Sequence, residues 1–63
     1  MPLVTIKAIQ GRTVEQKRKL AKDITDAIVK HYGAKPDSVI IDFVDYSKHD
    51  LAKAGELFLD REK

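Results

Sequence analysis

The sequence predicts an α+β protein: a short β-α-β protomer with two parallel strands, one long helix and a small C-terminal strand or turn, completed by oligomerisation. Two segments, residues 3–9 and 38–46, are rich in β-branched residues, and a helical pattern separates them. The 63 residues make one domain, 1–63, with little interior to fill. Because the sequence has no cysteine, disulfides cannot compensate for the small core, and association of subunits is expected instead.

The first strand is expected over residues 3–9, LVTIKAI. Alternation places Val4, Ile6 and Ala8 on one face, and this uncharged face should contact the helix. Pro2 precedes the strand, at a position where the sheet tolerates a residue without a backbone N–H.

The helix is expected to begin at Val14. Thr13 and Gln16 have the spacing of a capping box. Gly33, followed by Pro36, marks the end of the helix. The apolar arc of the helix consists of Leu20, Ile24, Ala27 and Ile28, bordered by Val14, Ala21 and Tyr32.

The second strand is expected over residues 38–46, SVIIDFVDY, and both of its faces are largely apolar. Two strands joined by one helix form a right-handed β-α-β unit with parallel strands. One helix covers one face, so something outside the chain must cover the other. On that other face, Lys7 and Asp42 are expected to lie side by side as a partly buried charge pair.

The C-terminal segment is expected to contain a turn around residues 48–50 and a short strand or helical turn in ELFLD. Leu57, Phe58 and Leu59 are too apolar to remain in water, so they are expected to dock on another subunit.

Composition argues against several classes of function. The net charge is +2, from 12 basic and 10 acidic residues that are interspersed, which disfavours a nucleic-acid partner. No apolar run or leader pattern indicates a membrane, so a cytoplasmic protein is expected. Two histidines without cysteine make a metal site unlikely to form, and none is expected.

The residues that could perform chemistry are few. The sequence has no Ser-His-Asp grouping and no glycine-rich phosphate loop. Removal of Met1 would make Pro2 a free secondary amine, whose pKa burial and a nearby cation would lower toward that of a general base. Arg12 could bind a carboxylate or stabilise an oxyanion. This pair can move a proton along a conjugated keto acid without a cofactor. The alternative is that Pro2 only opens the strand and Arg12 is a solvated turn residue.

Four motifs, PLVTIK, GRT-x-EQK, SV-I-I-x-F and LAKAGEL, together resemble the 4-oxalocrotonate tautomerase family over essentially the whole chain. The resemblance implies a homohexamer arranged as a trimer of dimers and removal of Met1. It also implies that Pro2 is the general base and that Arg12 binds a small-molecule carboxylate substrate across a subunit boundary.

Two positions depart from the family pattern. The family's second arginine falls on Ile40, and an aromatic residue of the site falls on Leu51. The substrate-binding residues are therefore expected to be Arg12, Ile40 and Leu51, the last two forming an apolar wall. The expected function is a tautomerase of 2-oxo or 2-hydroxy-enoate acids. The alternatives are a dehalogenase, hydratase or decarboxylase using the same proline, or a non-catalytic oligomeric binding module.

Overall fold

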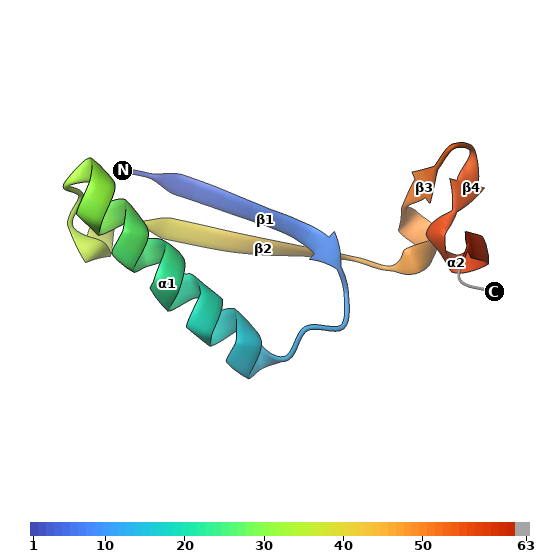
Figure 1. Ribbon diagram of the computed structural model, residues 1–63, viewed down its shortest axis with the longest axis horizontal. Helices are drawn as coiled ribbons and strands as arrows, with labels where there is room; N and C mark the ends of the chain where they lie inside the picture. Colours follow the sequence, from blue (N-terminus) through green and yellow to red (C-terminus); the bar gives the residue numbers. More distant parts are fainter. Residues whose placement is uncertain (62–63) are drawn as a thin grey trace.

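The computed structural model describes residues 1–61 as a β-α-β unit followed by a small C-terminal hairpin and helical turn (Figure 1). Strands β1 and β2 pair in parallel, and β3 and β4 pair antiparallel. This confirms the predicted α+β class. The elements are β1 (Leu3–Ile9), α1 (Val14–Tyr32), the 3-10 turn η1 (Pro36–Ser38), β2 (Ile40–Tyr46), the 3-10 turn η2 (Lys48–Asp50), β3 (Ala52–Lys53), β4 (Glu56–Leu57) and α2 (Phe58–Arg61).

Local hydrogen bonds fix both ends of α1. The Thr13 hydroxyl accepts from the Gln16 backbone N–H at 3.1 Å, and the Gln16 side chain accepts from the Thr13 N–H at 2.9 Å. Gly33 has φ of 68°, and its N–H donates to the Val29 carbonyl at 3.1 Å. The predicted capping box and the predicted end of the helix are confirmed, because each depends only on neighbouring residues.

The predicted start of the second strand was two residues too early. Pro36 opens the turn η1, in which the Ser38 hydroxyl donates to the Lys35 carbonyl at 2.8 Å and the Val39 N–H donates to the Pro36 carbonyl at 3.1 Å. These bonds hold the backbone in a 3-10 turn, so β2 begins only at Ile40.

The register of the sheet overturns the predicted pair of Lys7 and Asp42. Asp42 lies opposite Thr5, whose hydroxyl donates to the Asp42 carboxylate at 2.7 Å. Lys7 lies one register step further along, opposite Val44. Within residues 1–61 no ion pair joins Lys7 to Asp42. The error came from estimating strand depth without knowing the length of η1.

Helix α1 lies over one face of the two-stranded sheet (Figure 1). Val4, Ile6 and Ala8 are half-buried, while the alternate residues Leu3, Thr5 and Lys7 are exposed. On the helix, Ile24 and Ile28 are half-buried as expected, but Leu20 remains 42% exposed and Ala27 is exposed as well. The apolar arc of α1 is thus wider than the part that the sheet covers.

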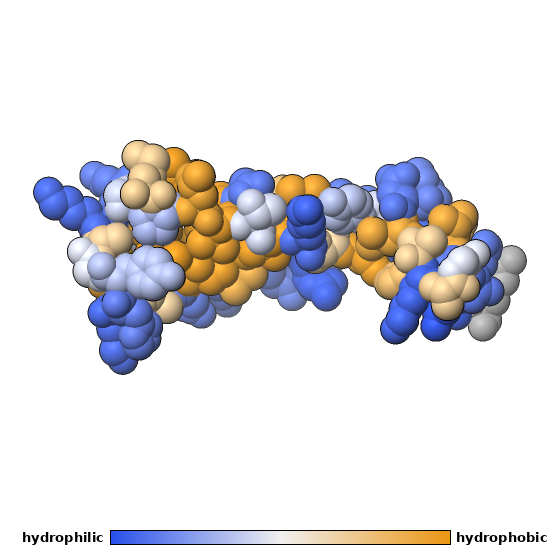
Figure 2. Space-filling model, turned by 90° about the horizontal axis from the view of Figure 1, so that it is seen from above, coloured by the Kyte–Doolittle hydropathy of each residue, from blue (hydrophilic) through white to orange (hydrophobic). Residues whose placement is uncertain are grey.

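A single chain lacks a complete hydrophobic core. No residue within 1–61 is fully buried. The Cα radius of gyration is 15.2 Å, against about 11 Å for a compact domain of this length. Figure 2 shows a continuous apolar surface along the body of the molecule, flanked by hydrophilic side chains. Other polypeptide surfaces must therefore complete this core.

The hairpin of β3 and β4 and the short α2 stand beyond the far end of the parallel sheet, away from α1 (Figure 1). Leu57 is 39% exposed and Leu59 is 52% exposed. The segment ELFLD was expected to be a short strand or a helical turn, and it contains both. No helix in the described part of the chain is long and apolar enough to cross a bilayer.

The hairpin turn supplies a test of backbone strain. Ala54 has φ of 54°, a left-handed conformation that costs an alanine about 1 kcal/mol and a glycine almost nothing. We expect Ala54→Gly to raise the free energy of unfolding by up to about 1 kcal/mol, measured by urea denaturation at fixed protein concentration. Ala52→Gly, in the adjacent strand, is the control and should lower it. A loss of stability in both variants would contradict the assignment of strain to Ala54.

Candidate active site

Two of the four predicted site residues, Pro2 and Ile40, lie together at the start of the parallel sheet. The Ile40 N–H donates to the Pro2 carbonyl at 3.0 Å, which extends the ladder by one residue beyond β1. This bond holds the backbone of Pro2 through its carbonyl and leaves its nitrogen at the end of the sheet. Pro2 is half-buried, and Ile40 is 45% exposed.

The other two predicted residues, Arg12 and Leu51, follow the opposite end of the sheet. Arg12 lies in the loop between β1 and α1, and Leu51 follows η2. The Leu51 carbonyl accepts from the Phe58 N–H at 2.9 Å, which ties it to the start of α2. The seven residue steps from Pro2 to Ile9 span about 23 Å. One chain therefore does not bring Pro2 and Arg12 into the same site.

Arg12 lines a hollow of about 280 Å³ between the start of α1 and the carboxyl ends of the strands. No hydrogen bond or ion pair engages the Arg12 side chain within residues 1–61, so its guanidinium is available for an anion. The hollow has an apolar floor with polar groups around it, lined by Ile6, Ala8, Arg12, Gln16, Lys17, Leu20, Phe43 and Asp45.

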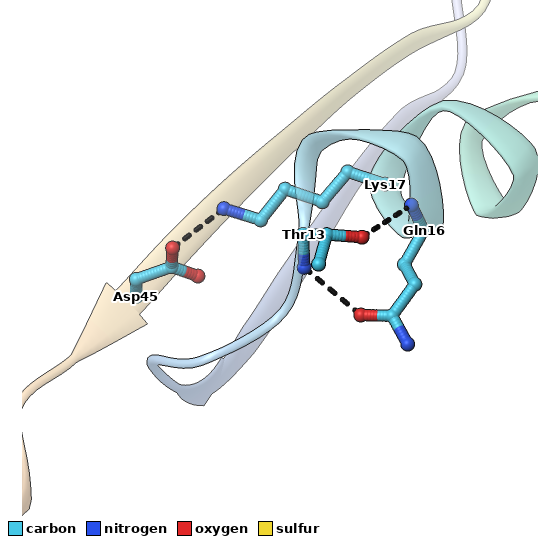
Figure 3. Close-up of polar contacts among 4 residues, drawn as sticks. All are labelled: Thr13, Gln16, Lys17 and Asp45. Carbon is cyan, nitrogen blue, oxygen red and sulfur yellow. Dashed lines mark hydrogen bonds and ion pairs between the residues drawn. The ribbon is translucent and has the colours of Figure 1, made fainter.

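An ion pair between Lys17 and Asp45 crosses this hollow (Figure 3). The Lys17 ammonium lies 2.5 Å from the Asp45 carboxylate and 5.8 Å from the centre of the Phe43 ring. Both side chains are partly shielded from water, at 29% and 37% exposed. The pair connects the first turns of α1 to the end of β2, and it thereby fixes the two ends of the loop that carries Arg12.

Sequence reasoning missed this contact, although two signals for it were present. Lys17 is four residues before Ala21 and so shares the helix face that meets the sheet. Asp45 is two residues after Phe43 and so shares the face of β2 that meets the helix. Neither signal fixes how the helix is rotated over the sheet, so the pairing itself could not be predicted.

The remaining charge pairs of α1 face solvent. Arg18 lies 3.2 Å from Glu15, and Lys22 lies 2.8 Å from Asp26. The hydrogen bond to Asp26 and the charge of that carboxylate raise the pKa of Lys22 above its ordinary value. These pairs lie outside the hollow. Within residues 1–61, no cluster of three His, Cys, Asp or Glu side chains could hold a metal ion.

Comparison with known proteins identifies the family. The family profile described as "Tautomerase enzyme" matches residues 2–61. The chain is 37% identical to 2-hydroxymuconate tautomerase of Bacillus subtilis over 62 residues, which are 98% of this chain and 100% of that one. It is 42% identical to a probable tautomerase of Lactococcus lactis over 57 residues, 90% of this chain and 93% of that one. A solved 4-oxalocrotonate tautomerase isozyme from Methylibium petroleiphilum has a TM-score of 0.89 at 33% identity, covering 97% of this chain and 95% of that chain.

The parallel β-α-β unit with its C-terminal hairpin thus defines a small α+β isomerase of the 4-oxalocrotonate tautomerase fold. The chain belongs to the tautomerase family. The family that the sequence motifs indicated is confirmed, and so is the expectation of an isomerase.

The ion pair across the hollow leads to a prediction about stability. Lys17→Met should lower the free energy of unfolding by about 1 kcal/mol, because it removes a shielded ion pair and a cation-π contact. Lys22→Met removes an exposed pair on the same helix and should leave stability unchanged within error. Urea denaturation at one protein concentration measures both. Equal losses would show that the Lys17 pair is no stronger than a surface pair.

Proposed function

We propose that the protein is a tautomerase of 2-oxo and 2-hydroxy-enoate acids, with Pro2 as general base and acid after removal of Met1. The position of Pro2 is the observation that carries this proposal. Its carbonyl is tied into the sheet by the Ile40 N–H, while its nitrogen lies at the end of the ladder. With Met1 attached, that nitrogen is a tertiary amide without basic character. After removal of Met1, it is a secondary amine on an anchored residue.

The proposed reaction moves one proton and leaves the composition of the substrate unchanged. The Pro2 amine takes the proton from the enol hydroxyl, and the oxygen electrons form the C2 carbonyl. The electrons of the C2–C3 double bond then take the proton from the Pro2 ammonium at C3, which restores the amine. The step is redox-neutral. It needs a base of near-neutral pKa and a cation that stabilises the enolate.

Arg12 is the proposed carboxylate anchor, and it would come from a second copy of the chain. Because β1 is parallel to β2, Pro2 and Arg12 lie at opposite ends of the protomer. Two copies placed side by side in opposite directions would bring Pro2 of one next to Arg12 of the other. Leu51, at the same end as Arg12, would then contribute to the wall that faces Ile40.

A homohexamer built as a trimer of dimers is the proposed assembly. Its support is the incomplete core of the single chain and the wide apolar arc of α1, of which Leu20 remains exposed. Leu57 and Leu59 on the projecting C-terminal segment supply further apolar surface for contact between copies. The cytoplasm is the proposed location.

Replacement of the proposed base gives the first functional test. Intact mass should show that Met1 is absent from the purified protein. Pro2→Ala should then lower kcat/KM for ketonisation of phenylenolpyruvate by about 100-fold or more. Pro36→Ala, the matched control at the start of η1, should retain most of the activity. Full activity in Pro2→Ala would rule out the amine mechanism.

A mixing experiment tests whether the site is shared between copies. Pro2→Ala and Arg12→Ala chains, each nearly inactive alone, are unfolded, mixed in equal amounts and refolded. If Pro2 and Arg12 come from different copies, random assortment restores both native residues in about one site in four. Activity should therefore reappear in the mixture at about that level. If both residues of a site belonged to the same chain, no mixed site would be intact and the mixture would stay inactive.

A further inference from the structure

The open face of the sheet is apolar at the end that holds Pro2. Leu3 and Ile40 are register partners there, and their side chains are on the face away from α1. Leu3 is 71% exposed and Ile40 is 45% exposed. Both adjoin Pro2, Leu3 through the chain and Ile40 through its hydrogen bond to the Pro2 carbonyl. A group that reaches Pro2 across this face would lie on the two side chains.

A negative charge follows at the next register step of the same face. The Asp42 carboxylate accepts from the Thr5 hydroxyl at 2.7 Å, two residues and about 7 Å along the strand from Ile40. The first cation on this face is Lys7, one register step beyond Asp42. Asp42 therefore separates Lys7 from the apolar surface beside Pro2.

These features impose two penalties on a substrate with two carboxylates. The carboxylate near Pro2 would lose water against Leu3 and Ile40 without gaining a charged or hydrogen-bonding partner from either side chain. It would also be repelled by the like charge of Asp42 on the same face. An apolar or aromatic tail in the same position meets neither penalty, and it buries apolar area on Leu3 and Ile40 instead.

We propose that the site selects 2-hydroxy-enoates with a single carboxylate and an apolar tail over dicarboxylates, with Ile40 and Leu3 accepting the tail and Asp42 repelling a second carboxylate. The proposal rests on the proposed function, because it takes Pro2 as the reacting base. Under this arrangement Arg12 of the second copy holds the one carboxylate, and the tail extends over the open face.

The test is the ratio of kcat/KM for phenylenolpyruvate, a monocarboxylate with an aromatic tail, to kcat/KM for 2-hydroxymuconate, a dicarboxylate. The wild type should favour phenylenolpyruvate by at least about tenfold. Ile40→Arg places a guanidinium beside Pro2 and should shift the ratio toward 2-hydroxymuconate by about 10- to 100-fold. Ile40→Leu, the matched control, should leave the ratio unchanged.

A second variant keeps the test independent of how Ile40→Arg assembles. Asp42→Asn removes the repelling charge at nearly constant volume and should shift the ratio toward 2-hydroxymuconate by about fivefold. Asp23→Asn makes the same change of charge on the exposed side of α1 and should not shift it.

The outcomes separate this proposal from the proposed function. A wild type that turns over both substrates equally well, or prefers 2-hydroxymuconate, overturns the selectivity but leaves the tautomerase mechanism standing. A ratio that stays fixed in both Ile40→Arg and Asp42→Asn overturns the roles of these residues. Activity on neither substrate overturns the proposed function, and the selectivity with it.

Discussion

One helix can cover only one face of a two-stranded sheet, and this limit governs the rest of the molecule. Within residues 1–61 every side chain keeps some exposure, including those of Ile6 and Phe43 beneath α1. Burial of apolar area is the main favourable term in folding, and a chain of this size gains too little of it alone. The stability of the fold is therefore coupled to the surfaces that cover its open face, and so to protein concentration.

The same β-α-β connection that leaves the core open also divides the candidate site. A helical crossover makes the strands parallel, so both strands begin at the end that holds Pro2 and finish at the end that holds Arg12. The chain thus places a potential base at one end and a free guanidinium at the other. Association of copies in opposite directions would resolve both deficits together, because the contact that buries the sheet would also unite the two residues.

Sequence reasoning succeeded where the determinants are local. The capping box of Thr13 and Gln16 and the left-handed Gly33 fixed the helix ends from adjacent residues alone. It failed where the outcome depends on how elements are placed relative to one another. The turn at Pro36 shifted the start of β2, so Asp42 pairs with Thr5 instead of Lys7, and the rotation of α1 decided that Lys17 reaches Asp45.

The candidate site shows the same division. The resemblance named Pro2, Arg12, Ile40 and Leu51 as a group, but no pattern in the sequence says that they occupy two ends of one protomer. That fact follows from the parallel register and the length of β1. The charge of Asp42 beside the apolar Leu3–Ile40 pair likewise emerged only from the register.

The most direct measurement is a dilution series followed by native mass spectrometry and far-ultraviolet circular dichroism on the same samples. If copies of the chain complete one another's core, oligomers will predominate at working concentration. On dilution, dissociation into single chains and loss of the helical signal will then occur together. Single chains that keep the full helical signal at high dilution would contradict the account, because they would show that one copy folds without the others.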